Sequence, residues 1–404
     1  MLLLAACHAR GRSGVGPEAS ILLCQLLNHD LIPNVPSQGS LGASGDLAPL
    51  AHIALALIGE GKTIKGDAFS EALKKNNLSA LTLTSKLGLS LINGTHVHTA
   101  LGCLVQSEVE QLAKIADIAC AMSAEAMLCS IQPFRNDVHL LRPHPNQIKS
   151  AKNLTRLMKD SEISLSHENC GEVQDAYSIR CAPQVHGASR QTFAHAQQVF
   201  EIEIASVTDN PLLIGEEVVS AGHFHGQPIA LAIDYMKLGI AELANISERR
   251  TERLLNKDYS RGLPAFLAQK PGLQSGMMIC QYTAASLVSE NKVLSHPSST
   301  DSIPTGANQE DHVSMGMNAA LHAKKVLQNT KNVLAIELLV AAQALDCRKI
   351  IQSEKPGQGV AVAWKAVREQ SKILTDDRSL SEEIQSLDMI RILQSVEKEV
   401  GVLE

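Results

Sequence analysis

The chain has 404 residues, of which 45% are hydrophobic but only 3% aromatic, and it carries a net charge of −6. Lysine and arginine are interspersed with acidic residues, so the sequence shows no basic patch of the kind that binds nucleic acid. Nine cysteines without a CxxC pair indicate neither a zinc ribbon nor a disulfide framework, and they suit a reducing cytoplasm.

The chain begins with an apolar stretch, residues 1–7, that has no basic leader and is too short to cross a bilayer. We expect it to be part of a helix. With so few aromatic residues, the core must consist of Leu, Ile, Val and Ala, which suits closely packed helices.

The segment Gly42-Ala43-Ser44-Gly45-Asp46 can close on itself to make an electrophile. If the Gly45 nitrogen attacks the Ala43 carbonyl and water leaves, a five-membered ring forms. Loss of the Ser44 hydroxyl then leaves a methylene conjugated to a ring carbonyl. Glycine permits the close backbone approach and the strained dihedrals that closure needs. We expect Asp46 to cap a helix whose amide groups favour the negative charge of an attacked electrophile.

Long helices are predicted where Ala and Leu recur three and four residues apart, at 95–129, 187–205, 228–256, 277–295 and 312–348. Helices of this length normally pack as a bundle, so we expect an all-α fold. Strand signals are sparse, and residues 212–214 and 217–220 predict one small hairpin.

Several motifs resemble those of the aromatic amino-acid ammonia-lyases, and together they cover almost the whole chain. In order they are 39–52, Asn93-Gly94-Thr95, 173–181, 183–187, 208–212, 222–228, 242–250 and 308–315. The resemblance implies a long-helix bundle of the ammonia-lyase/fumarase type. It also implies a single body over residues 1–404, with a cofactor-bearing region at about 1–95 and a helical bundle at about 96–404.

In that family an Ala-Ser-Gly triplet becomes the methylidene-imidazolone (MIO) cofactor. The triplet alone is weak because its residue types are common, but its place among the other motifs favours the functional interpretation. The resemblance implies that Ala43, Ser44 and Gly45 form MIO, with no metal or nucleotide. Asn93 resembles the asparagine that hydrogen-bonds the cofactor carbonyl oxygen, and Gln174 resembles a second polar partner.

Four residues are implied to handle the substrate. Tyr177 and Arg180 lie three apart, so one helical turn or a tight loop can point both the same way. In the family pattern the arginine holds the substrate carboxylate and the tyrosine hydroxyl works near the amine. Phe224 matches an aromatic residue near the cofactor. Glu310 resembles the carboxylate that faces the imidazole in histidine-deaminating members, whereas members that use phenylalanine or tyrosine usually carry an amide there.

The resemblance therefore implies non-oxidative deamination of L-histidine to trans-urocanate and ammonia, by a cytoplasmic homotetramer whose sites draw on several chains. Two alternatives stay open. One is a lyase or aminomutase that acts on tyrosine or phenylalanine with the same cofactor. The other is a catalytically dead helical scaffold that survives as an assembly partner.

The chain departs from the family pattern at its start. In family members an N-terminal segment carries a mobile-loop tyrosine, usually assigned as the base, and a histidine that contacts the substrate. Of the four tyrosines here, only Tyr177 falls in a site motif. We therefore expect this segment to be absent and the chain alone to be less active, since losing a positioned acid or base costs about two to four powers of ten in rate.

Overall fold

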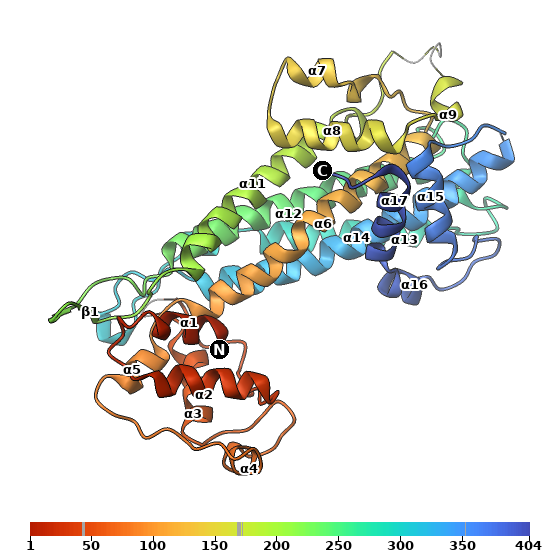
Figure 1. Cartoon of the computed structure of the whole chain (residues 1–404). Helices are drawn as coiled ribbons and strands as arrows, with labels where there is room; N and C mark the ends of the chain where they lie inside the picture. The colour runs from red at the N-terminus through yellow and green to blue at the C-terminus, as the bar shows by residue number, and fades with distance from the viewer. Residues whose placement is uncertain (43–44, 168–170, 172, 352) are drawn as a thin grey trace. The chain divides into compact units, whose positions relative to one another are not determined.

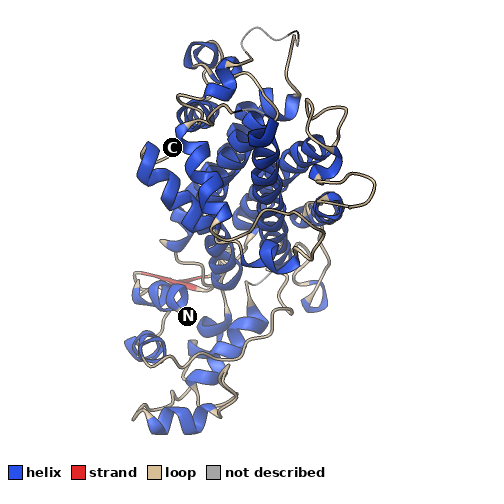
Figure 2. Cartoon of the chain, turned by 90° about the vertical axis from the view of Figure 1, so that its right-hand side faces the viewer, coloured by secondary structure: helices blue, strands red, loops and turns tan. Residues whose placement is uncertain are grey.

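The computed structural model describes residues 1–42, 45–167, 171, 173–351 and 353–404 (Figure 1). Most of these residues are helical, and the strands among them form one two-stranded hairpin (Figure 2). The predicted all-α fold with a minor hairpin is confirmed. Within the described ranges, no helix combines the length and apolarity needed to cross a membrane.

The described chain forms two compact units, each assembled from three segments. Unit 1 comprises Met1–Gln106, His195–Tyr235 and His296–Lys324. Unit 2 comprises Ser107–Ala194, Met236–Ser295 and Lys325–Glu404. The single body expected over residues 1–404 stays a prediction.

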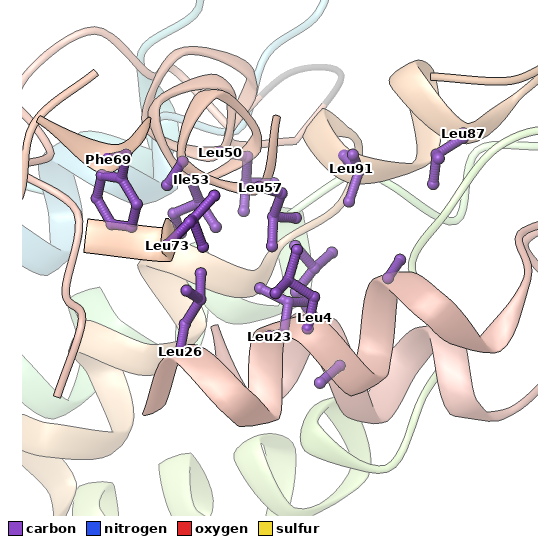
Figure 3. Packing of buried hydrophobic residues seen from close by; sticks show 14 residues of the cluster. Leu4, Leu23, Leu26, Leu50, Ile53, Leu57, Phe69, Leu73, Leu87 and Leu91 are labelled. Carbon is purple, nitrogen blue, oxygen red and sulfur yellow. The ribbon is translucent and has the colours of Figure 1, made fainter. Parts of the chain in front are cut away.

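Five short helices at the start of unit 1 share an aliphatic core. They are α1 (Leu2–Ala9), α2 (Pro17–Asn28), α3 (Leu47–Leu57), α4 (Phe69–Lys75) and α5 (Leu87–Ile92). Figure 3 shows Leu23 of α2 and Leu57 of α3 pointing into this core together with Phe69. The apolar start of the chain lies in α1 as expected, and its Leu4 is fully buried in the same cluster.

Unit 1 also contains the hairpin. Strands β1 (Leu212–Ile214) and β2 (Glu217–Val219) pair antiparallel, with Leu212 opposite Val219. Gly215 adopts a φ of +62° in the connecting turn, a conformation that glycine reaches at little cost. The predicted hairpin is therefore confirmed.

The five predicted long helices are all present. They are α6 (His96–Ala126), α11 (Ala182–Ile204), α12 (Gln227–Leu255), α13 (Met278–Leu294) and α14 (Gly316–Ile351). Two starting points were wrong. Helix α11 begins at Ala182 rather than 187, because Pro183 fits the first turn, where a missing N–H leaves no bond unmade. Helix α14 begins at Gly316 rather than 312, because Met315 has a φ of +55° that interrupts the helix.

Shorter helices complete unit 2. They are α7 (Asn136–Leu140), α8 (Pro145–Leu157), α9 (Glu162–Leu165), α10 (Tyr177–Arg180), α15 (Gln358–Arg368), α16 (Ser381–Ser386) and α17 (Met389–Val400). The core of this unit is aliphatic, and small side chains such as Ala116 and Ala119 of α6 are fully buried. Small residues at such positions let helices approach closely.

Candidate active site

The backbone around Gly45 is held against that of Gly94. The two residues form an isolated bridge, and the Asp46 N–H donates to the Gly94 carbonyl oxygen at 2.8 Å. Gly45 has a φ of +85°, and a Cβ placed on it would lie 2.2 Å from the Gly94 oxygen. Only glycine fits there. The other two predicted ring-forming residues, Ala43 and Ser44, lie outside the described residues.

The Asp46 carboxylate is fully buried and ties this loop to the start of α6. It accepts hydrogen bonds from the N–H groups of Val97 at 2.7 Å and His98 at 2.9 Å. It also accepts from Ser40 Oγ at 2.8 Å and lies 2.9 Å from His98 Nδ1. Asp46 therefore caps α6. As predicted, Asp46 also stands at the N-cap position of the helix that follows it, but its side chain makes no cap bond to α3 because these donors already occupy its oxygens.

Asp46 stays ionised despite its burial. Burial by itself would raise the pKa of Asp46, but the charge and hydrogen bonds of His98, together with Ser40, bring the pKa below its usual value. A buried carboxylate with this many donors is costly to displace, so it fixes the loop at residue 46.

The loop is fixed on its other side at Gly42. Gly42 N–H donates to Ser40 Oγ at 3.1 Å, while Ser314 Oγ donates to the Gly42 carbonyl oxygen at 2.9 Å. The Gly226 N–H approaches the same oxygen at 3.5 Å. A Cβ on Gly42 would lie 2.4 Å from Ser314 Oγ, so this position is also restricted to glycine. The residues on both sides of positions 43 and 44 are thus anchored.

Asn93, the predicted partner of the cofactor carbonyl, is buried next to Gly94. Its Nδ2 donates to the Asn210 carbonyl oxygen at 2.9 Å and to Asp209 Oδ1 at 3.3 Å. Asp209 is in turn paired with Lys86 at 2.7 Å. Asn93 Oδ1 is buried and has no hydrogen-bond partner in the described part of the chain. Sequence reasoning gave Asp209 no role, although its motif at 208–212 was a signal that pointed to it.

Phe224 and Glu310 lie on neighbouring segments of unit 1. Phe224 is half-buried in a turn before α12. Glu310 closes a small loop with Thr305 through two backbone bonds and a side-chain bond from Thr305 Oγ1 to Glu310 Oε2 at 2.5 Å. The two segments meet where the rings of His225 and His312 stack with centroids 5.7 Å apart.

Helix α10 in unit 2 brings Tyr177 and Arg180 together. It is a single turn, and the Arg180 guanidinium lies over the Tyr177 ring, 5.0 Å from its centroid. This agrees with the common direction predicted from their spacing. Tyr177 is 71% exposed.

A cavity of about 690 Å³ lies beside this turn, and Gln174, Arg180, Gln184 and Arg261 are among its lining residues. Arg180 Nε and Gln184 Oε1 are buried and find no hydrogen-bond partner among the residues that the structure describes. Arg261 is already paired with Asp175 at 2.9 Å. Arg180 therefore offers an unused, charged donor at the cavity, which suits a carboxylate.

The described site residues thus form two groups. Unit 1 holds Gly45, Asn93, Phe224 and Glu310, and unit 2 holds Gln174, Tyr177 and Arg180. Over the described ranges, no group of three or more His, Cys, Asp or Glu side chains is placed to hold a metal ion.

Comparison with known proteins gives a consistent result. The family model of the aromatic amino acid lyases matches residues 1–369. A histidine ammonia-lyase of Gloeobacter violaceus is 52% identical, and the match covers 100% of this chain and 80% of that protein.

Two solved structures resemble the whole fold. The crystal structure of a histidine ammonia-lyase from Trypanosoma cruzi has a TM-score of 0.88 and 39% identity, covering 98% of this chain and 76% of that one. The crystal structure of a tyrosine aminomutase from Streptomyces globisporus has a TM-score of 0.91 and 36% identity. The match covers 100% of this chain and 82% of that one.

Proposed function

The chain belongs to the aromatic amino acid lyase family, and we propose that it deaminates L-histidine to trans-urocanate and ammonia. The observation that carries the proposal is the anchored backbone on both sides of residues 43 and 44, with glycine required at position 45. Glu310 supports histidine as the substrate.

We propose that Ala43, Ser44 and Gly45 form MIO. The described residues fit such a ring, because Gly45 and Gly94 lie backbone to backbone with no space for a side chain. When present, MIO supplies an electrophilic methylene for the substrate amine, which turns ammonia into a better leaving group. Asn93 can donate to its carbonyl oxygen only by releasing the longer of its two bonds, the 3.3 Å bond to Asp209.

The substrate is held by charge complementarity at both of its ends. In this proposal Arg180 binds the carboxylate, for which its unused Nε is suited. Glu310 accepts a hydrogen bond from an imidazole N–H, which a phenyl ring lacks. The Tyr177 hydroxyl acts near the substrate amine, and Gln174 is a second polar partner of the cofactor. Phe224 packs near the cofactor. The Cα–Cβ bond is then held in place while a base takes a Cβ proton, the C–N bond breaks and its electron pair leaves with the amino group.

We further propose a cytoplasmic homotetramer in which neighbouring chains complete each site. Every described cysteine is free, as expected where thiols stay reduced. In the same proposal, the chain is one body over residues 1–404.

A side-by-side assay of histidine, tyrosine and phenylalanine tests this function. We expect urocanate from histidine and little product from the other two. Glu310→Gln should lower kcat/KM for histidine about tenfold, because a charge-assisted hydrogen bond becomes a neutral one worth about 1–2 kcal/mol less. Glu216→Gln, an exposed change in the hairpin turn, is the matched control and should leave kcat/KM unchanged.

The second candidate is a tyrosine-specific aminomutase or lyase, which the high TM-score to the aminomutase structure favours. Faster conversion of tyrosine than of histidine by the unaltered protein would establish this candidate and overturn ours.

A further inference from the structure

A fully buried arginine lies beside the turn that carries Tyr177 and Arg180. Arg250 of α12 is 0% exposed and is paired with Glu337 of α14, through Nε at 2.5 Å and Nη2 at 2.8 Å. Ser123 Oγ donates to the same carboxylate at 2.7 Å. This pairing satisfies two of the three guanidinium nitrogens and neutralises the buried charge.

The third nitrogen of Arg250 reaches the site turn. Nη1 donates to the Ser178 carbonyl oxygen at 3.3 Å, and Ser178 lies between the two predicted site residues of α10. Nη1 also approaches His186 Nε2 at 3.5 Å. His186 can accept there because its Nδ1 faces Asp117 at 2.7 Å and because burial lowers the pKa of His186, which favours the neutral ring.

A second arginine holds the preceding part of the same segment. Arg261 donates through Nη2 to Asp175 Oδ1 at 2.9 Å, and Asp175 Oδ2 accepts the Ser130 N–H at 2.8 Å. Arg261 is supported by Arg348, whose Nη1 donates to the Arg261 carbonyl oxygen at 3.1 Å. Asp175 is next to Gln174, so this contact sets the backbone directly before α10.

We propose that Arg250 and Arg261 are positioning residues that orient the segment 174–180 for the reaction. Helix α10 is one turn long, and an isolated turn has no stability of its own, so tertiary contacts must set its direction. Arg250 holds the middle of α10 at Ser178, and Arg261 holds the residues that lead into α10 at Asp175. The roles of Tyr177 and Arg180 rest on the proposed function, but the anchoring of the segment does not.

Arg250→Lys and Arg261→Lys test the proposal, because lysine keeps the charge but not the planar, multidirectional donor set. Arg368→Lys is the matched control. Arg368 is a largely buried arginine of the same unit that binds Asp346 at 2.7 Å and the Ser371 carbonyl oxygen at 3.1 Å, away from this network. Each variant is studied as the full chain in its native assembly, after thermal melting has shown that it folds.

Two measurements separate positioning from general structural damage. Hydrogen exchange of a peptide covering residues 173–181 should quicken about tenfold in both test variants and stay at the parent rate in the control. KM for histidine should rise about tenfold, and kcat/KM should fall up to about a hundredfold, because small displacements of substrate-positioning groups are costly.

Unchanged exchange and unchanged KM in the test variants would overturn the proposal, as would equal changes in Arg368→Lys. If Arg250→Lys does not fold, Arg261→Lys decides the matter alone, since its side chain is 21% exposed and tolerates substitution better. If the unaltered protein does not convert histidine, the proposed function fails, while the exchange comparison still decides the positioning role.

Discussion

At the scale of single residues, the site depends on glycines that no other residue can replace. The need for glycine at position 45 could be predicted from the chemistry of ring closure, which demands close backbone approach. Its partner Gly94 could not be predicted from any local pattern, because the two glycines meet only through the tertiary fold; the family resemblance alone placed the neighbouring Asn93 at the cofactor. The same holds for Asp46, whose acceptance of hydrogen bonds from His98 joins residues that are 52 positions apart.

Gly45→Ala should destabilise the protein far more than an ordinary glycine replacement. The new Cβ would lie 2.2 Å from the Gly94 oxygen, so overpacking of about 1–3 kcal/mol adds to the strain of a positive φ, about 1–2 kcal/mol. Gly66→Ala is the control, because Gly66 has a φ of +96° but nothing within 4 Å of its Cβ position. Urea unfolding of both variants measures the difference, and equal losses would contradict the close contact.

At the scale of elements, α15 begins on a buried carboxylate. The Gly357 N–H at the start of α15 donates to Glu125 of α6, at 2.9 Å to Oε1 and 3.1 Å to Oε2. Burial raises the pKa of Glu125 to about 7, although the bonds from Ser161 and Gly357 partly oppose this. The folded protein therefore keeps this proton at a pH where the unfolded chain releases it.

The sign of the resulting pH dependence follows from this shift. The stabilisation that protonated Glu125 contributes is complete below pH 4.5, the ordinary pKa of a glutamate side chain. It is lost as the pH rises to about 7, the raised pKa of Glu125. This amounts to about 3 kcal/mol over the window. Glu125→Gln should remove this decline, so that the variant is more stable than the parent above pH 7. Urea unfolding between pH 4.5 and pH 7 measures this decline in stability, with the exposed Glu382→Gln as control. If stability changes with pH in parallel for Glu125→Gln and the parent, the raised pKa of Glu125 is refuted.

The long helices could be predicted from their apolar periodicity, and three of their first residues to within one position, but the first residues of α11 and α14 could not. Helix α14 starts at Gly316 because the residues before it bind other segments, as when Ser314 Oγ donates to Gly42. Those contacts join distant parts of the sequence and leave no local pattern. Tyr177 and Arg180 of α10 were indicated by the family resemblance of the motif around them, and their spacing was compatible with a helical turn. The arginines that anchor α10 were not predicted, since buried arginines cannot be told from exposed ones in sequence.

At the scale of the whole molecule, the proposed tetramer needs an apolar surface for neighbouring chains. Helix α13 exposes Ile279 and Tyr282 by 56% and 57%, three residues apart on one face, and Val293 by 73%. Exposed apolar residues that share a helix face are typical of interfaces between subunits.

Light scattering should therefore give about four times the chain mass of 43.3 kDa. Ile279→Glu combined with Tyr282→Glu should lower the observed mass, because burying two new carboxylates in an interface is unfavourable. Ile64→Glu, at a residue 59% exposed in unit 1, is the control. A parent protein that is monomeric, or a double variant that still forms tetramers, would exclude this face as an interface.

We propose that residues 43–45 become a ring that serves deamination, and the intact mass of the purified chain tests this. We expect a mass lower than that of the sequence by two water molecules, assigned by fragmentation to the peptide that contains Ser44. The Ser44→Ala chain should not show that loss. An unmodified mass in assembled protein that converts histidine would contradict the account, and an unmodified mass in inactive protein would favour the helical scaffold instead.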